Sequence, residues 1–382
     1  MTFVFISNYF NHHQKPLADA IYTQLGCGYH FIETEPMSDE RKNMGWGMDQ
    51  KPEYVLQSYA GAKQLQQSQK LLLDADVVMW GSAPYNMIEP RLKAGKLTFK
   101  YSERIYKTGC PYHKLPWHFL RYTKLYRRYK NFYLLCASAY ASGDFAKTFT
   151  FLNKAYKWGY FTTVNTYPDI DALIAAKKPA SILWAGRFLA LKHPEHVVEV
   201  AKRLRDDGID FSLRMIGNGD QESAVREMIK KEGLSQYIEL LGFMKPEEVR
   251  EYMEQSEIYL FTSDRNEGWG AVLNESMNSG CAVVACRAIG SVPFLLKEGE
   301  NGAIYKTGNV DELYHKVKYL LTHSEERKRI SYNAYTTMTQ EWNPENAAQK
   351  LLQLCKHLLA GEKHPFPFDT GVCSKADILK DE

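Results

Sequence analysis

Short apolar runs alternate along the chain with longer segments in which apolar residues recur every three to four positions. The run Thr2–Ile6 predicts a buried strand, and the amphipathic segment Gln14–Leu25, which follows a polar turn, predicts a helix. The pattern continues with a helix over 54–73 and strands at 77–80, 96–101 and 132–138. Strands that alternate with helices are typical of a parallel sheet covered on both faces.

The second half of the chain repeats this pattern more regularly, after a polar segment at 169–178. Strands are predicted at 181–185, 211–216, 238–242, 258–262 and 282–286, with helices at 194–206, 220–232, 246–254, 271–278 and 310–321. Five strands separated by helices predict a second Rossmann-like domain. The length of 382 residues also exceeds what one hydrophobic core usually supports, about 250 to 300 residues. We therefore expect domains at 1–178 and 179–340, followed by a helix and tail at 341–382.

The chain shows no targeting or metal signal. Residues 1–7 have no basic part, and Ser7 and Asn8 interrupt the apolar run too early for a secretory signal. No charge-free apolar run approaches 18 residues, so we expect a cytoplasmic protein without a membrane span. The seven cysteines are scattered and never spaced CxxC, which indicates neither a disulfide framework nor a zinc site.

Charge is balanced overall but unevenly distributed. The chain has 48 Lys and Arg and 45 Asp and Glu, and a formal charge of +3 gives no reason to expect nucleic-acid binding. Residues 91–143, however, hold twelve Lys or Arg and one acid, Glu103, which leaves 36 basic and 44 acidic residues elsewhere.

The segment 114–130 combines six of these basic residues with five aromatic ones, a pattern typical of interfacial segments. It predicts peripheral contact with an anionic membrane, at the inner face if the protein is cytoplasmic. Two alternatives remain: a packed amphipathic helix with a solvated basic face, and contact with an anionic acceptor such as a polyprenyl diphosphate.

Ligands bind open α/β sheets beyond the carboxyl ends of the strands, so the loops after the strands carry the candidate chemistry. The first such loop lacks the glycines of a dinucleotide fingerprint, because the first glycine of the chain is Gly26. This argues against an NAD-dependent dehydrogenase.

The loops of the second domain are more informative. Gly186, Arg187 and Lys192 precede a helix start, where two cations and the helix dipole can bind a diphosphate; solvated surface charges are the alternative. The run Gly217-Asn218-Gly219 after the next strand either lets a ligand approach the backbone or forms a plain tight turn.

The most specific pattern lies in residues 263–275. Glu267 stands in a glycine-bearing loop after a strand, and Glu275 lies eight residues later, inside the following helix. Carboxylates accept hydrogen bonds from sugar hydroxyls, and the amides of Gly268 to Val272 form a helix N-terminus suited to an anion. The loop therefore fits a ligand with a sugar, a phosphate and a ribose.

Together with Leu241-Gly242-Phe243, these motifs resemble the C-terminal domain of retaining, GT-B-fold glycosyltransferases of family 4, the E-x7-E type of glycosyl transferases group 1. The resemblance covers residues 181–325, and the N-terminal half only by architecture. It implies two Rossmann-like domains that face a cleft, with the helix at 344–359 crossing back to the N-terminal domain. It also implies a nucleotide-diphosphate sugar, such as a UDP-sugar, as co-substrate, and no metal or other cofactor, because protein cations hold the diphosphate.

The resemblance implies roles residue by residue. Arg187 and Lys192 bind the diphosphate and support the departing nucleotide, Glu267 binds the transferred sugar, and Glu275 binds the ribose. Glu267, Arg187 and Lys192 are therefore the main candidate catalytic residues. The full predicted donor site comprises Gly186, Arg187, Lys192, Gly217, Asn218, Gly242, Phe243, Met244, Glu267, Gly268, Trp269, Gly270, Ala271, Val272 and Glu275.

The resemblance assigns the acceptor to the N-terminal half. Its first loop holds Asn11, His12 and His13 instead of the glycine-rich turn that is usual in the family. The histidines either hydrogen-bond acceptor hydroxyls or phosphate, or are ordinary solvated residues at a helix start. Where family members often have a histidine, Glu103 is expected to orient the acceptor hydroxyl and Arg104 to meet its phosphate, unless the two pair with each other. Glu103 and His13 are accordingly further catalytic candidates.

The predicted function is the metal-independent transfer of a hexosyl group, with retention of configuration, to a hydroxyl of a saccharide or lipid-linked saccharide in surface polysaccharide or glycan biosynthesis. A nucleotide-sugar epimerase of the same shape and a non-catalytic nucleotide-binding protein are the alternatives.

Overall fold

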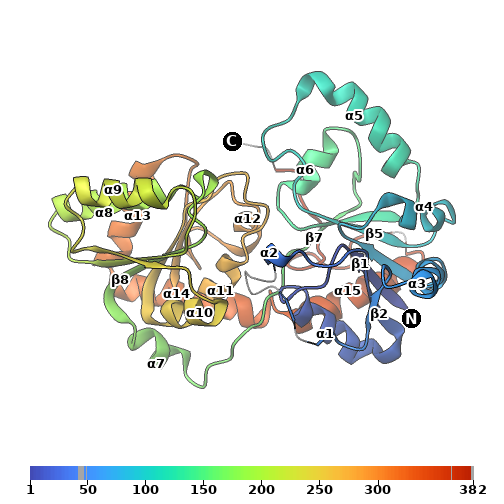
Figure 1. The fold of residues 1–382 in the computed structure, drawn as a ribbon, viewed down its shortest axis with the longest axis horizontal. Coiled ribbons are helices and arrows are strands. Elements are labelled where there is room, and N and C mark those ends of the chain that lie inside the picture. The colour runs from blue at the N-terminus through green and yellow to red at the C-terminus, as the bar shows by residue number, and fades with distance from the viewer. Residues whose placement is uncertain (42–46, 49, 363, 380–382) are drawn as a thin grey trace. The chain divides into compact units, whose positions relative to one another are not determined.

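The computed structural model describes residues 1–41, 47–48, 50–362 and 364–379. The chain divides into two compact units: Met1–Thr163 with the chain from Trp342 form the first, and Val164–Glu341 form the second. Each unit contains its own parallel sheet with helices packed on it (Figure 1). The expected architecture of two parallel-sheet α/β domains, GT-B, is confirmed.

The first unit is built on a seven-stranded sheet in the order β3-β2-β1-β4-β5-β6-β7. Its strands are β1 Phe3–Ser7, β2 Tyr29–Glu33, β3 Val55–Gln57, β4 Val77–Trp80, β5 Thr98–Ser102, β6 Phe132–Cys136 and β7 Ala155–Lys157. Its helices are α1 Lys15–Leu25, α2 Asp39–Arg41, α3 Ala62–Asp74, α4 Tyr85–Lys93, α5 Leu115–Tyr122, α6 Ala141–Ala146 and α15 Pro344–Leu359. All five residues of β1 are buried, as expected for a central strand with helices on both faces.

The C-terminal part of the chain belongs to the first unit. Helix α15 packs against α1, so the expected return of this helix to the N-terminal domain is confirmed. Farther on, the Lys157 N–H donates to the Ser374 carbonyl and the Cys373 N–H donates to the Lys157 carbonyl, both at 2.8 Å. The tail thereby covers the edge of β7, whose backbone groups would otherwise lack partners on that side.

The second unit is built on a six-stranded sheet in the order β10-β9-β8-β11-β12-β13. Its strands are β8 Lys178–Ala185, β9 Ser212–Ile216, β10 Ile238–Gly242, β11 Ser256–Phe261, β12 Ala282–Cys286 and β13 Ala303–Tyr305. Its helices are α7 Ile170–Ala175, α8 Pro194–Asp206, α9 Glu222–Lys231, α10 Pro246–Gln255, α11 Val272–Asn278, α12 Val292–Leu295, α13 Val310–Thr322 and α14 Ser324–Gln340. Helices α8, α9 and α13 cover one face, and α10, α11 and α14 cover the other (Figure 1).

Some sequence expectations differ from the fold. The segment 54–73 is not one helix: Val55–Gln57 pairs in parallel with β2, and α3 begins only at Ala62, because sheet pairing overrides the helical pattern there. The second sheet has a sixth strand, β13, whose three residues are too few to show a period. The division between the units falls at 163/164 instead of 178/179, because α7 packs against α14 of the second unit.

Among the described residues, no helix combines the length and the apolar content that crossing a membrane requires.

Candidate functional site

The loops after β8, β9 and β10 are joined by backbone hydrogen bonds. The Gly186 N–H donates to the Ile216 carbonyl at 3.0 Å, and the Phe188 N–H donates to the Asn218 carbonyl at 2.8 Å. The Gly217 N–H donates to the Gly242 carbonyl, also at 2.8 Å. These bonds make a framework from three sequence motifs that lie far apart in the chain.

The two glycines around Asn218 serve this framework. Gly217 has φ +132°, and a Cβ added there would lie 1.9 Å from the Gly186 carbonyl oxygen. A Cβ on Gly219 would lie 2.7 Å from the Phe188 carbonyl oxygen. The structure therefore favours the tight-turn interpretation of this run, in which glycine permits contact between two loops.

Lys192 and Glu267 meet at the carboxyl ends of β8 and β11. The Lys192 ammonium forms an ion pair with Glu267 Oε2, and Ser263 Oγ donates to the same oxygen at 3.1 Å. Thr262 Oγ1 donates to the Lys192 carbonyl at 2.6 Å, which joins the two loops a second time. Within the described residues, Oε1 of Glu267 accepts no hydrogen bond. One oxygen of the carboxylate is thus held by Lys192 and Ser263, and the other can accept a hydrogen bond from a ligand.

The start of α11 offers backbone donors. Gly270 has φ +82°, and an added Cβ would lie 2.2 Å from the Phe261 ring, so this turn requires glycine. In the part of the chain that the structure describes, the N–H groups of Gly270, Ala271 and Val272 donate to no protein acceptor. Such free amides are suited to a negatively charged oxygen.

Trp269 has a different role from its neighbours in this loop. Its side chain is 1% exposed, and its indole N–H donates to Asn274 Oδ1 at 2.9 Å. The Trp269 carbonyl accepts a hydrogen bond from Ser291 Oγ at 2.6 Å. Its side chain therefore supports the loop from inside, and only its backbone faces the region that the sequence assigns to a ligand. The preceding residue, Gly268, is also buried.

Glu275 is partly exposed in the first turn of α11, and its carboxylate accepts no hydrogen bond from the described residues. Burial raises the pKa of this carboxyl, and the nearby Arg250 guanidinium opposes the shift. Arg250 comes from α10, where its Nη1 donates to the Glu275 carbonyl at 2.8 Å. Sequence reasoning missed Arg250, because nothing in the pattern of α10 indicates that it reaches this helix.

The remaining predicted donor residues are accessible. Arg187 is exposed, and its side chain forms no hydrogen bond or ion pair with any described residue. Phe243 is 55% exposed and Met244 partly exposed, in the turn between β10 and α10. A Cβ added to Gly242 would meet nothing within 4 Å, so its glycine serves the local φ of +73° and not a close approach.

His193 links the beginning of α8 to the β11–α11 loop. Its backbone is left-handed, with φ 47°, and its Nδ1 and Nε2 lie 2.8 Å from Glu195 Oε1 and 3.4 Å from Asp264 Oδ2. The Glu195 hydrogen bond, and to a lesser extent Asp264, raises the pKa of His193. His193, Glu195 and His196 also offer three potential metal ligands within 4.8 Å of one another. We assign no metal to them, because both ring nitrogens of His193 already have carboxylate partners in Glu195 and Asp264.

In the first unit, Glu103 lies after β5 within a polar cluster. Tyr160 Oη donates to Glu103 Oε1 at 2.7 Å, and the Lys107 ammonium lies 2.6 Å from Oε2. The rings of His13 and Tyr160 are 6.4 Å apart, and the rings of His12 and His13 are 3.8 Å apart. Burial, with a contribution from His12, lowers the pKa of His13 to about 3, so this imidazole stays neutral. Lys107 and Tyr160 were not predicted from the sequence.

Two of the predicted acceptor residues have structural roles. Arg104 is 3% exposed, lies 3.5 Å from Asp144 Oδ1 and stacks over the Tyr140 ring at 5.0 Å. It is neither a surface phosphate ligand nor the partner of Glu103, because Asp144 holds it inside the unit. Asn11 Oδ1 accepts hydrogen bonds from the N–H groups of His13 and Gln14 at 3.0 and 3.2 Å, so it closes the turn before α1. Asn11 is only 9% exposed, so it has little contact with solvent.

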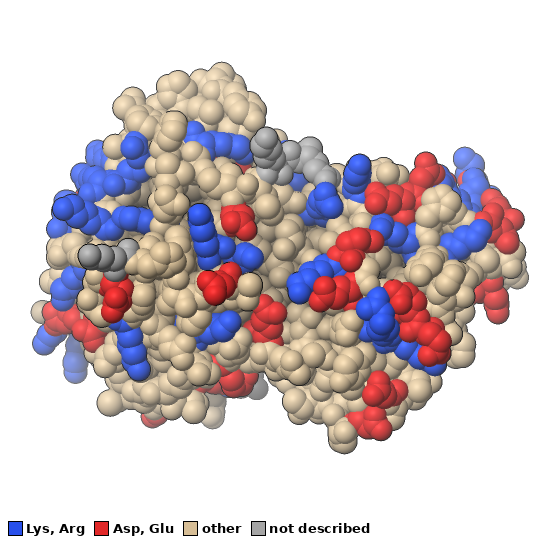
Figure 2. Space-filling view, turned by 180° about the vertical axis from the view of Figure 1, so that it is seen from behind, with Lys and Arg blue, Asp and Glu red and all other residues tan. Residues whose placement is uncertain are grey.

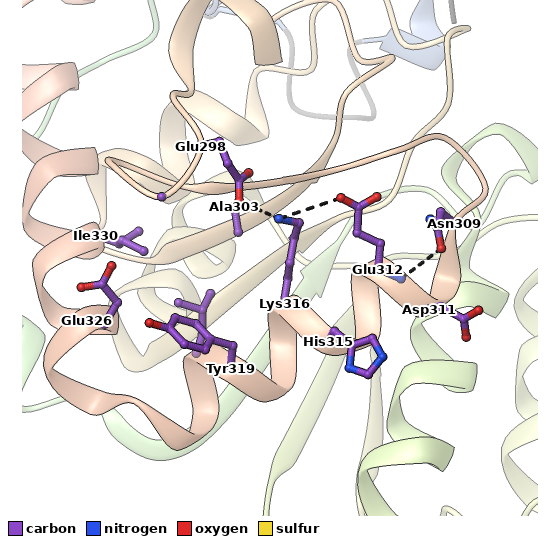
Figure 3. A pocket seen from close by; sticks show the side chains of 12 residues that line it. Glu298, Ala303, Asn309, Asp311, Glu312, His315, Lys316, Tyr319, Glu326 and Ile330 are labelled. Atoms are coloured by element: carbon purple, nitrogen blue, oxygen red, sulfur yellow. Dashed lines mark hydrogen bonds and ion pairs between the residues drawn. The ribbon is translucent and has the colours of Figure 1, made fainter.

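A separate pocket of about 580 Å³ lies between β13, α13 and α14 (Figure 3). Its charged side chains are largely paired: Lys316 Nζ lies 2.6 Å from Glu298 Oε1 and 4.0 Å from Glu312 Oε1. None of its lining residues belongs to the predicted donor or acceptor sets. The pocket therefore carries no part of the candidate site.

Comparison with known proteins finds a family match in the second unit. Residues 168–337 match the family model of glycosyl transferases group 1. An uncharacterized glycosyltransferase of Methanocaldococcus jannaschii is 30% identical over 151 residues, 40% of this chain and 41% of that protein. An alpha-D-kanosaminyltransferase of Streptomyces kanamyceticus is 25% identical over 177 residues, 46% of this chain and 45% of that protein. The chain thus spans less than half the length of these curated relatives.

Solved structures match nearly the whole chain. Anabaena HepE in complex with UDP and glucose is 13% identical, with a TM-score of 0.65, over 93% of this chain and 99% of that one. The lipopolysaccharide outer core galactosyltransferase WaaB is 16% identical, with a TM-score of 0.67, over 94% and 99%. At such identities the likeness shows the fold alone, whereas the family model and the relatives support the resemblance to glycosyl transferases group 1.

Proposed function

We propose that this protein is a retaining glycosyltransferase that transfers a hexosyl group from a nucleotide-diphosphate sugar to a hydroxyl of a saccharide or lipid-linked saccharide. The match to glycosyl transferases group 1 supports glycosyl transfer. The amylovoran biosynthesis glycosyltransferase AmsK of Erwinia amylovora, 28% identical over 144 residues, supports a place in polysaccharide assembly.

One observation carries the proposal. The carboxyl ends of β8 and β11 bring together the Lys192–Glu267 pair, while the Glu275 carboxylate and the amides at the start of α11 keep free hydrogen-bonding capacity. The carboxylates of Glu267 and Glu275 match the hydroxyls of a sugar and of a ribose, and the cationic and amide groups match the diphosphate between them.

In the proposed reaction, Arg187 and the Lys192 ammonium stabilise the negative charge that develops on the departing diphosphate. Lys192 has three N–H donors, so it can hold Glu267 and a phosphate oxygen together. Glu267 accepts a hydrogen bond from the transferred sugar through Oε1. The bond from the anomeric carbon to the diphosphate breaks, the acceptor oxygen bonds the same carbon on the same face, and the acceptor proton passes to the leaving phosphate. Protein cations serve the diphosphate, and we propose that no metal is required.

The proposal is tested by incubating the protein with UDP-, GDP- and ADP-sugars, with and without saccharide acceptors. A glycosyltransferase forms a glycoside only with acceptor, and NMR of the product anomer reports retention. Conversion of the donor without acceptor would instead identify an epimerase. Binding of a nucleotide sugar without any turnover would identify a non-catalytic binder, and an inverted product would contradict the retaining mechanism.

Arg187→Ala is expected to weaken donor binding without loss of stability. The guanidinium has no partner among the described residues, so its removal breaks no internal contact, and a lost charge-assisted contact raises the donor Kd about 10- to 100-fold. Calorimetric titration with a nucleoside diphosphate measures the change. Arg226→Ala, an exposed arginine on α9, is the matched control. An unchanged Kd in Arg187→Ala would remove this residue from the diphosphate site.

Donor binding is expected to weaken as the pH falls through the Glu275 pKa. Burial places this pKa above the ordinary 4.5, and only the ionised carboxylate accepts from both ribose hydroxyls. The free protein gains stability over the same pH range, because a raised folded-state pKa favours the protonated folded form, so unfolding of the protein cannot imitate the effect. Glu275→Gln should abolish this pH dependence, as should a dideoxyribose nucleotide. A persistent dependence in both cases would contradict the ribose assignment.

A further inference from the structure

The structure divides the basic and aromatic segment 114–130 into an inner and an outer face. On the inner face, the Tyr126 ring packs against Phe132, Phe145 and Phe151 at centroid distances of 5.9, 5.9 and 5.7 Å. On the outer face, Trp117 is 57% exposed and Leu120 is 67% exposed. The inner face is thus packed, as in the alternative of a packed amphipathic helix. The outer face presents large apolar side chains to solvent.

A second exposed aromatic ring lies beside this outer face. Phe149 is 61% exposed, and its ring contacts the Phe119 ring edge-on at 6.2 Å. Phe149, Phe151 and Asn153 all have positive φ, between 54° and 55°, a conformation that is unfavourable for residues other than glycine. This backbone turns Phe151 into the core and Phe149 out to solvent.

Uncompensated positive charge surrounds these apolar side chains. Five basic residues of the segment are exposed and form no ion pair with any described residue: Lys114, Arg121, Lys124, Arg127 and Lys130. Trp117, Leu120, Arg121 and Lys124 follow the helical spacing of three and four, so they share one face. The Arg121 guanidinium lies 5.2 Å from the Trp117 ring centroid. Figure 2 shows Lys and Arg gathered along this flank of the first unit.

The count of basic residues alone overstates the charge of the wider region 91–143, because some of its arginines are internal. Arg91 is 1% exposed and donates to the carbonyls of Leu72, Ala75 and Leu97 at 2.7 to 2.9 Å. Arg104 is held by Asp144. The free positive charge is therefore concentrated on the outer face of 114–130.

We propose that Trp117, Leu120 and Phe149, with the five unpaired basic residues, form a binding surface for an anionic lipid bilayer. We call this surface the outer patch. The three apolar side chains enter the boundary between headgroups and acyl chains, while the basic residues attract anionic headgroups. The proposal stands apart from the proposed catalysis, because membrane binding is measured without donor or acceptor.

The composition of the outer patch favours a bilayer over a protein partner. A stable protein interface buries about 800 Å² on each side around an apolar core from which charges are depleted. Here three protruding apolar side chains are interspersed with like charges. A bilayer requires only shallow insertion of a few side chains and gains from every nearby cation.

Flotation of the full chain with vesicles tests the proposal. We expect the protein to float with phosphatidylcholine vesicles that contain phosphatidylglycerol, and its recovery to fall at high salt. Recovery with vesicles of phosphatidylcholine alone should be small. Arg121→Glu with Lys124→Glu should raise the lipid concentration for half-binding at least about 25-fold, since each lost cation weakens binding about fivefold. Trp117→Ala with Leu120→Ala should remove the apolar contribution, so that the remaining binding is purely electrostatic and is lost at high salt.

Matched controls lie on α3 of the same unit. Lys63→Glu with Lys70→Glu changes the net charge equally, and Leu65→Ala with Leu73→Ala removes side chains that are 40% and 42% exposed. Both control variants should bind like the unaltered protein, and thermal unfolding checks that every variant is folded. The Trp emission should shift to shorter wavelength with anionic vesicles, but not in Trp117→Phe. Equal recovery with neutral and anionic vesicles, or equal losses in patch and control variants, would overturn the proposal.

Discussion

Glu267→Gln is expected to lower kcat about 1000-fold while the donor Kd changes only a few-fold, because loss of one preorganised electrostatic group typically costs 100- to 1000-fold. The substitution keeps the size of the side chain but removes the charge that faces the developing positive charge of the sugar. Ser263 and Lys192 hold one carboxylate oxygen, so the side chain is already oriented before a ligand arrives. Single-turnover kinetics with a saturating donor measure the change.

The Lys192–Glu267 contact adds a stricter version of this test. If the two side chains act as one unit, Lys192→Met and Glu267→Gln together should cost little more than Glu267→Gln alone. Glu222→Gln, at the start of α9, is a control in which a glutamate that is paired with Arg226 loses its negative charge. Retention of most activity in Glu267→Gln would refute the catalytic assignment, even if the donor still binds.

Gly217→Ala is expected to destabilise the second unit by about 4 kcal/mol. The new Cβ would lie 1.9 Å from the Gly186 carbonyl oxygen, so the β8 and β9 loops must separate. This clash adds about 3 kcal/mol of overpacking to about 1 kcal/mol for the left-handed backbone. Urea unfolding followed by tryptophan fluorescence measures the loss of stability.

Gly208→Ala isolates the backbone contribution to this loss. Gly208 also has positive φ, +70°, but an added Cβ there meets nothing within 4 Å, so about 1 kcal/mol is expected. Equal destabilisation by the two substitutions would show that loop contact is not what Gly217 provides. In that case the run Gly217-Asn218-Gly219 would regain its interpretation as a surface for a ligand.

Much of the fold is predictable because its signals are local. Buried strands such as β1 and β12 are short apolar runs, and amphipathic helices such as α8 and α13 show their period within a dozen residues. The strand β3 escaped prediction because its three residues continue into a helical pattern, and its assignment depends on pairing with β2. Pairing partners are not encoded in any local window.

The candidate site, like the fold, was predictable only in part. Its loops can be located from the sequence, because Arg187, Lys192 and Glu267 each follow a predicted strand and the carboxyl ends of parallel strands share one edge. Which side chains meet there could not be predicted. Lys192 and Glu267 are 75 residues apart and touch because β8 lies next to β11, an order that the sheet topology alone reveals.

By itself, the sequence determined that the chain forms two parallel α/β sheets and that its candidate chemistry lies in the loops after β8 and β11, since periodicity and loop position are properties of neighbouring residues. The tertiary structure decided the rest. It buried Arg104 beside Asp144, turned Tyr126 inward and Trp117 outward, and paired Lys192 with Glu267. Each of these outcomes depends on contacts between segments distant in sequence, because the neighbours that a side chain meets in the fold decide whether it is buried, exposed or paired.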